Sequence, residues 1–263
     1  EKPSAIEHFE EILNVSDGIM VARGDLGVEL PVQNVPPIQK RLVLRCREVA
    51  KPVIVATQML ESMIQSPMPT RAEVSDVANA IYEGADAIML SAESAAGSFP
   101  IEAVSTMNNV AVEVENDPTY TNMIEATRTA NRSTIAEGIV AAAREIAETT
   151  QIKSICCFTE SGTTALLTAR ERPRVPILAM TSVMPTARRL ALSWGTNCVM
   201  TGPKNRFKEA VVSAVRAALA EGYAGADDQL VIMAGVPFNI PGTTNILRVA
   251  PCDERQIYSM DPE

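Results

Sequence analysis

The chain has 263 residues, of which 46% are hydrophobic and 21% charged, so it is long enough for one large or two ordinary globular domains. Its net charge of −9 argues against a nucleic-acid backbone as a general partner. No run of about 18 apolar residues is present and the first residues are unlike a secretory leader, so we expect a cytoplasmic protein without a membrane span. The five cysteines lack metal-ligand spacing and are expected to be reduced.

The first region opens with a helix expected over residues 3–14, where apolar side chains recur at helical spacing. The only histidine, His8, lies on its charged side and is expected to be solvated. A short apolar strand over 18–22 then ends at Arg23-Gly24-Asp25. This tripeptide predicts a polar turn at the carboxyl end of a strand, either a ligand site or a surface turn with a chance ion pair.

Two further strands repeat this pattern. A helix over 35–51 precedes a strand over 52–56 that ends in Thr57-Gln58, and a strand over 86–90 ends in Ser91-Ala92-Glu93. Between them, Thr70 and Glu73 form a capping box that predicts a helix to about residue 83. A helix over 100–115 completes the third unit. Three β/α units at a nearly constant period indicate a parallel sheet or barrel with one functional face.

A polar segment over 117–133 predicts a junction, which a helix could cross, between domains 1–117 and 118–263. The second domain resumes with an Ala-rich helix over 134–149 and is expected to be a smaller, open-sheet α/β domain. Its strands are expected at 154–158, 176–180, 198–200, 229–234 and 246–250, and its further helices near 163–171, 185–193 and 206–221.

The strand ends of the first region carry candidate chemistry. Glu1 stands where a preceding strand would finish, so its carboxylate and that of Asp25 could face one crevice and bind Mg²⁺ through oxygen. The Thr57 hydroxyl could position a substrate, and Ser91 could donate or relay a proton. Each of these residues could instead have a purely structural role, since threonine at a strand end often stabilises a turn through its hydroxyl.

A second candidate site follows the strand over 154–158, where hydroxyls and free N–H groups of residues 158–164 could bind a phosphate. The alternative is an ordinary helix-capping loop. Glu160 in this loop is unexpected, because a carboxylate opposes phosphate binding, so the ligand could differ or be absent.

Several long motifs resemble the pyruvate kinase family, and the resemblance covers the whole chain. The motifs are residues 18–29 (GIMVARGDLGVE), 56–63 (ATQMLESM), 69–73 (PTRAE), 76–80 (DVANA) and 86–93 (DAIMLSAE). The resemblance implies an α/β fold in which residues 1–117 are the second part of a catalytic (β/α)8 TIM barrel. It implies that residues 118–263 are the C-terminal regulatory domain of that family.

The resemblance also implies a reaction: phosphoryl transfer from phosphoenolpyruvate to ADP, giving pyruvate and ATP, with Mg²⁺ and usually K⁺. By motif position, Glu1 and Asp25 match the metal ligands, and Gly24, Asp25 and Thr57 match the substrate site. Arg23 and Ser91 complete the implied catalytic set with Thr57. The loop of the second domain matches the site of a sugar-phosphate effector, and a homotetramer is implied. The implied effector-binding residues are Thr159, Ser161, Gly162, Thr163, Thr164 and Gly242.

One departure from the family concerns the beginning of the chain. The family's catalytic lysine lies two residues before the glutamate matched by Glu1, so we expect a fragment that is inactive alone. An alternative function is a non-catalytic metabolite-sensing or assembly module derived from the family, which absence of that lysine upstream would favour. Another phosphoenolpyruvate-using barrel enzyme would share the Mg²⁺ chemistry but lack the second domain.

Overall fold

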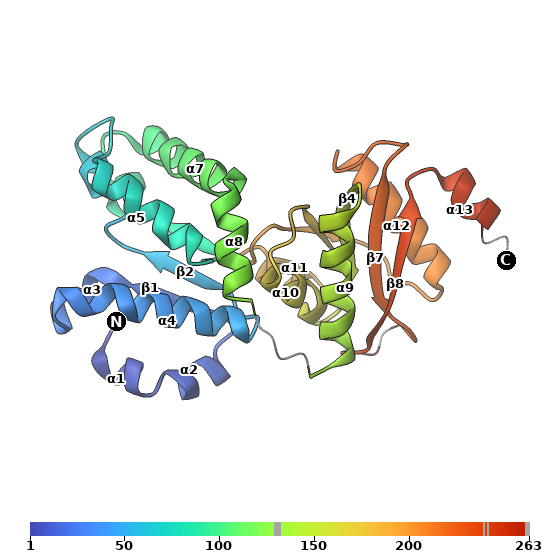
Figure 1. Cartoon of the computed structure of the whole chain (residues 1–263), viewed down its shortest axis with the longest axis horizontal. Helices are drawn as coiled ribbons and strands as arrows, with labels where there is room; N and C mark the ends of the chain where they lie inside the picture. The colour runs from blue at the N-terminus through green and yellow to red at the C-terminus, as the bar shows by residue number, and fades with distance from the viewer. Residues whose placement is uncertain (129–132, 239, 241, 261–263) are drawn as a thin grey trace. The chain divides into compact units, whose positions relative to one another are not determined.

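The computed structural model describes residues 1–128, 133–238, 240 and 242–260. They form two compact units, Glu1–Thr129 and Ala130–Glu263, each with its own sheet (Figure 1). Helix α8 (Pro118–Ala126) packs Tyr120 and Ile124 into the core of the first unit. The domain boundary expected at 117/118 stays a prediction, and residues 129–132 of the expected junction lie outside the described residues.

The first unit is built on a three-stranded parallel sheet, β1-β2-β3, in which Ala22, Ala56 and Met89 lie in register at the carboxyl ends of the strands. This confirms the parallel β/α arrangement. The other elements of the unit connect or cover these strands. In chain order, the unit contains α1 (Pro3–Glu7), α2 (Phe9–Val15), β1 (Ile19–Ala22), α3 (Arg23–Glu29), a 3-10 turn (Val32–Asn34), α4 (Val35–Glu48), β2 (Val53–Ala56), a second 3-10 turn (Glu61–Ile64), α5 (Arg71–Tyr82), β3 (Ala87–Met89), α6 (Ala92–Ala95), α7 (Pro100–Asn116) and α8.

Two local predictions in this unit were wrong. The helix expected over 3–14 is two helices, because the backbone leaves the helical region at His8 (φ −101°, ψ 25°). The turn expected at Arg23 is the first turn of helix α3, which follows β1 directly. The helical conformation brings the Leu26 side chain into the core, where it is 1% exposed. This burial explains why the segment forms a helix and not an open turn.

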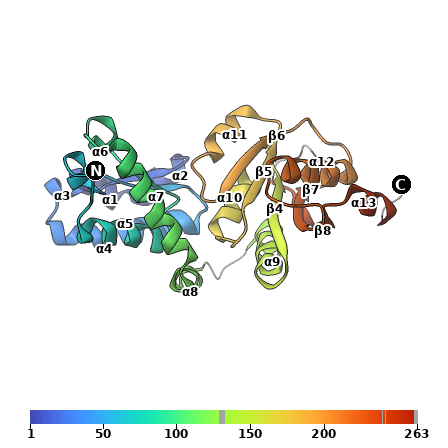
Figure 2. The ribbon, with the colours of Figure 1, turned by 90° about the horizontal axis from the view of Figure 1, so that it is seen from above.

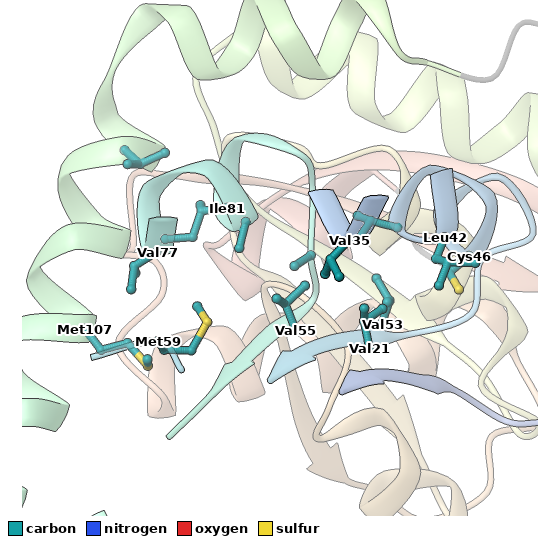
Figure 3. Close-up of a cluster of buried hydrophobic side chains, with 14 of the residues drawn as sticks. Val21, Val35, Leu42, Cys46, Val53, Val55, Met59, Val77, Ile81 and Met107 are labelled. Carbon is teal, nitrogen blue, oxygen red and sulfur yellow. The ribbon is translucent and has the colours of Figure 1, made fainter. Parts of the chain in front are cut away.

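The core of the first unit lies on one face of its sheet. Figure 3 shows Val21, Val53 and Val55 reaching from the strands towards Leu42 and Cys46 of α4. The alternation of a strand places intervening side chains on the other face, and Met20 there is 46% exposed. The sheet of this unit is therefore covered on its helical face, whereas its opposite face is partly open.

The second unit contains a five-stranded sheet of order β6-β5-β4-β7-β8. All neighbouring strands are parallel except β7 and β8, which are antiparallel. This confirms the open-sheet α/β domain, but the second unit is not the smaller of the two. Its elements are α9 (Ile135–Thr149), β4 (Ile152–Phe158), α10 (Thr163–Arg170), β5 (Ile177–Thr181), α11 (Met184–Leu190), β6 (Thr196–Met200), α12 (Phe207–Ala220), β7 (Gln229–Gly235), β8 (Thr244–Pro251) and α13 (Glu254–Met260).

Helices cover both faces of this second sheet (Figure 2). One core combines the strands with α12 and α13, and the other combines them with α9, α10 and α11. The neighbouring residues Cys156 and Cys157 belong to different cores, as strand alternation predicts. Within the described residues of both units, no helix is long and apolar enough to cross a bilayer.

Candidate functional site

The carboxyl ends of β1 and β2 meet through the main chain of Gly24 and the side chain of Thr57. The Gly24 N–H donates to Thr57 Oγ1 at 2.7 Å. A Cβ at position 24 would lie 3.3 Å from that oxygen, so a larger residue would crowd the contact. Thr57 and Gln58 both have positive φ, 70° and 54°, a conformation that non-glycine residues rarely adopt. The structure thus joins two predicted site residues at one strained turn, which is typical of functional sites.

Arg23 holds this turn in place. Its Nη2 donates to the Thr57 carbonyl at 2.7 Å and to the Gln58 carbonyl at 3.3 Å. Its Nη1 lies 2.7 Å from the carboxylate of Asp76, and the Arg23 side chain is only 10% exposed. These contacts direct the guanidinium at protein groups, so its role in this geometry is to position the Thr57 turn.

Hydrogen bonds link Arg23 to two further polar side chains. Gln39 Oε1 accepts from Arg23 at 3.5 Å, and Gln39 Nε2 donates to Glu83 at 2.8 Å. Burial raises the pKa of the Glu83 carboxyl, although the hydrogen bond from Gln39 opposes this. The positioning contacts of Arg23 therefore extend to a second layer of polar side chains.

Glu93 is a site residue whose role sequence reasoning missed. Its side chain is buried, and its two oxygens accept from the Leu60 N–H at 3.2 Å and the Ser91 N–H at 2.8 Å. It therefore joins the loop that begins at Thr57 to the loop that carries Ser91. In the sequence, Glu93 is visible only as an acidic residue two positions after the strand-end serine. That pattern does not show whether its carboxylate binds a metal ion or accepts hydrogen bonds from the main chain.

The two predicted metal ligands are both exposed. Asp25 lies in the first turn of α3, and Glu1 precedes α1. Within the described residues, no group of three or more His, Cys, Asp or Glu side chains is placed to hold a metal ion. Two carboxylates that share an ion with water and substrate oxygens would suit Mg²⁺, which rarely takes an all-protein cage. The exposed, hard oxygen donor of Asp25 fits such a role.

The second unit has a pocket at the carboxyl ends of its parallel strands. Five of the six predicted effector residues line it: Thr159, Ser161, Thr163, Thr164 and Gly242. The sixth, Gly162, is not part of the lining; it is the N-cap of α10 with φ 89°, and its N–H donates to Thr159 Oγ1 at 3.0 Å.

Contacts from α11 and β8 fix the loop around this pocket. Thr186 Oγ1 donates to the Glu160 carbonyl at 2.6 Å, and an Arg189 Nη donates to the Ser161 carbonyl. The hydroxyls of Thr164 and Thr244 lie 2.6 Å apart. These partners come from two separate elements, α11 and β8, and together they hold the loop.

The cysteines have no sign of reactivity. All five are free of disulfides, and four of them are buried. Burial raises the pKa of the Cys46 and Cys157 thiols to about 12 and that of Cys252 to about 11. At neutral pH they are therefore neutral thiols within the two units.

The fold and the strand-end sites define the chain as a piece of a β/α barrel followed by a doubly wound α/β domain, each with polar groups at the carboxyl edge of its sheet. The family model "Pyruvate kinase, barrel domain" matches residues 1–104, and "Pyruvate kinase, alpha/beta domain" matches residues 137–250. The chain belongs to the pyruvate kinase family.

Relatives and solved structures agree with this assignment. A pyruvate kinase of Methylorubrum extorquens is 51% identical over 95% of this chain and 52% of its own length. One of Clostridium acetobutylicum is 44% identical over 95% of this chain and 53% of its own length. A crystal structure of a pyruvate kinase from Cryptosporidium parvum has a TM-score of 0.84 and 35% identity, and covers 94% of this chain and 49% of that chain. The chain spans about half the length of the curated relatives it matches.

Proposed function

We propose that the full-length protein containing this chain transfers the phosphoryl group of phosphoenolpyruvate to ADP, with Mg²⁺ and K⁺ as cofactors, in the cytoplasm. The observation that carries the proposal is the contact between the Gly24 N–H and Thr57 Oγ1, because it joins two family motifs at the carboxyl edge of a parallel sheet. The family matches to both parts of the chain support it.

Each proposed site residue has a defined task. The backbone of Gly24 and Asp25 and the Thr57 hydroxyl bind the substrate carboxylate, and Arg23 positions the Thr57 turn. The Ser91 hydroxyl lies on the proton path to the enolate. Glu1 and Asp25 would hold Mg²⁺, which when bound neutralises the developing charge of the transferred phosphoryl group.

The second unit is proposed to regulate this reaction. Its pocket would bind a sugar-phosphate effector through the loop of residues 159–164 and Gly242. The active protein is proposed to be a homotetramer.

Replacing Asp25 by alanine in the full-length protein tests the catalytic proposal. We expect pyruvate formation to fall by at least 100-fold, because the variant loses a proposed metal ligand, while the thermal unfolding midpoint changes little because Asp25 is exposed. The measurement is a lactate-dehydrogenase-coupled assay titrated with MgCl₂. The matched control is Glu29→Ala on the same helix, also exposed, which should keep the wild-type rate.

A wild-type rate in Asp25→Ala would reject the metal-ligand assignment. A full-length protein that forms no pyruvate, yet binds sugar phosphates, would instead support the metabolite-sensing alternative.

A further inference from the structure

Two loops at the carboxyl ends of neighbouring strands in the first unit are joined by the side chain of Glu93. The β2 loop comprises residues 57–64, which follow β2, and the β3 loop comprises residues 91–98, which follow β3 and include α6. Glu93 lies on α6 and is 2% exposed. Its Oε1 accepts from the Leu60 N–H at 3.2 Å, and its Oε2 accepts from the Ser91 N–H at 2.8 Å. Because both bonds use one buried carboxylate, it sets the position of Ser91 relative to the β2 loop.

The far ends of the two loops meet through main-chain contacts. The Ser98 N–H donates to the Ile64 carbonyl at 2.8 Å. A Cβ at Gly97 would lie 3.2 Å from the Ile64 Cα and 2.5 Å from the Glu93 carbonyl oxygen, so the close approach of the loops requires glycine. Glu93 supplies the corresponding link closer to the strand ends.

The Thr57 turn is held by contacts that do not involve Glu93. The Gly24 N–H donates to Thr57 Oγ1 at 2.7 Å, and Arg23 Nη2 donates to the Thr57 carbonyl at 2.7 Å. Both donors come from the first turn of α3. Removal of the Glu93 carboxylate would therefore leave the proposed site of the substrate carboxylate in place, whereas it would release a restraint on Ser91.

Ser91 depends on this restraint because its own backbone is neither helical nor extended. It is the N-cap of α6, with φ −120° and ψ −103°. Its carbonyl accepts from the Ala95 N–H at 3.0 Å, but the N–H of an N-cap residue has no partner within its helix. The Glu93 carboxylate supplies that partner and so fixes the peptide group that carries the Ser91 side chain.

We propose that Glu93 is a positioning residue for the protonation step of the proposed reaction. Phosphoryl transfer breaks the bond between phosphorus and the enol oxygen, leaves the electron pair on the enolate of pyruvate, and forms a new bond to the terminal phosphate of ADP. The C3 carbon of the enolate then takes up a proton through the Ser91 hydroxyl, which recovers one from solvent. Glu93 holds Ser91 where this second step needs it. This inference rests on the proposed function and assigns to it the residue that orients the proton path.

The proposal predicts that loss of Glu93 separates the two steps. A misplacement of about 1 Å can cost about 100-fold in rate, and here it would fall on Ser91 and not on the Thr57 turn. Phosphoryl transfer is measured in the full-length protein as ATP formed in a single turnover by rapid quench. Protonation is measured in reverse, as exchange of the methyl hydrogens of pyruvate in D₂O with ATP and MgCl₂, by NMR. That exchange breaks and re-forms the C3–H bond along the same path.

We expect Glu93→Ala to lose about tenfold or more in methyl exchange, while the single-turnover rate of ATP formation and the KM for phosphoenolpyruvate change by less than about threefold. Glu93→Gln keeps one carbonyl acceptor and should lose about threefold in exchange. If circular dichroism shows that Glu93→Ala is unfolded, Glu93→Gln decides the test. A further variant combines Glu93→Ala with Ser91→Ala, in which exchange should be no slower than in Ser91→Ala alone, because Glu93 acts through Ser91.

Glu73→Gln is the matched control, because Glu73 of α5 restrains the same β2 loop from another side. Its carboxylate accepts from the Ser62 N–H at 2.7 Å and from Ser62 Oγ at 2.6 Å. This variant loosens the β2 loop without releasing Ser91, so the ratio of the exchange rate to the rate of ATP formation should stay at the wild-type value.

Three results would overturn the positioning role alone: equal losses of both rates in the Glu93 variants, unaltered exchange in them, or additive losses in the double variant. In each case the wild-type protein still forms ATP, so the proposed function stands. A wild-type protein that forms neither ATP nor exchanged pyruvate would overturn the proposed function and, with it, this inference.

Discussion

Glu93 shows how one buried side chain can organise two loops at the carboxyl ends of neighbouring strands. Carboxylates are seldom fully buried without partners, and Glu93 is 2% exposed with both oxygens accepting main-chain N–H groups. Those N–H groups belong to Leu60, downstream of Thr57, and to Ser91. The residue thus fixes the relative position of two strand-end loops.

Replacing Glu93 by alanine should leave the Leu60 and Ser91 N–H groups without acceptors. Buried unpaired groups of this kind cost about 1–3 kcal/mol each, so the free energy of unfolding should fall measurably in urea titrations. Glu93→Gln keeps one carbonyl acceptor and should be intermediate. Glu113→Ala, an exposed glutamate of α7, is the control. Equal urea midpoints for wild type and Glu93→Ala would show that the loops are held by other contacts.

At the scale of single elements, helix α9 begins with two reinforcing features. Thr134 and Glu137 form a capping box, and the same glutamate accepts from Arg170 Nη1 of α10 at 2.9 Å. The Arg170 hydrogen bond, opposed by burial and assisted by the Ser133 N–H, lowers the pKa of Glu137 from 4.5 to about 2. One ionised carboxylate therefore caps α9 and ties it to α10.

This shift predicts how stability depends on pH. Because the pKa of Glu137 is lower in the folded state than in the unfolded chain, its contribution is complete above about pH 4.5 and is lost as the pH falls towards 2. We expect Glu137→Gln to reduce the free energy of unfolding by about 1–2 kcal/mol at pH 7, after allowance for solvent screening, and by much less near pH 2.5. Urea unfolding across this range measures the difference. Glu145→Gln, exposed on α9, should show no such trend; a pH-independent effect of Glu137→Gln would exclude the ion pair as its source.

Local patterns predicted most elements, and non-local contacts explain the errors. The apolar runs that end in polar residues identified β1, β2 and β3, and Thr70 with Glu73 forms the capping box expected at α5. The equivalent box of α9 was readable from the same pattern. The antiparallel direction of β8 was not predicted, because strand direction depends on how the chain returns to the sheet rather than on its composition.

The candidate site, like the fold, was predictable from the sequence only in part. Residue type and strand-end position were enough to nominate Gly24 and Thr57, which the structure brings together. They were not enough to show that Arg23 binds main-chain carbonyls and Asp76, whose sequence separation from Arg23 is 53 residues. Contacts of this range depend on the packing of whole β/α units and leave no local pattern.

On the scale of the whole molecule, the two units differ in how completely their sheets are covered. In the second unit, helices pack on both faces, and β5 is buried along its whole length. In the first unit, among the described residues, β1 and β3 each pair with β2 alone, and Met20 is 46% exposed on the open face. Incomplete burial of apolar surface weakens the main stabilising force, so the first unit should have the smaller free energy of unfolding.

Equilibrium unfolding of the 263-residue chain in urea can separate the units, because the single tryptophan, Trp194, lies in the second unit. The Arg172 guanidinium lies 5.1 Å from its ring centroid, so loss of local packing should alter its fluorescence. We expect far-UV circular dichroism, which reports helices of both units, to begin its transition at lower urea than tryptophan fluorescence. Hydrogen exchange should then show faster exchange in β1 and β3 than in β4 and β5. Coincident transitions, with equal protection of both sheets, would mean that the units unfold as one and that the open face of the first sheet does not limit its stability.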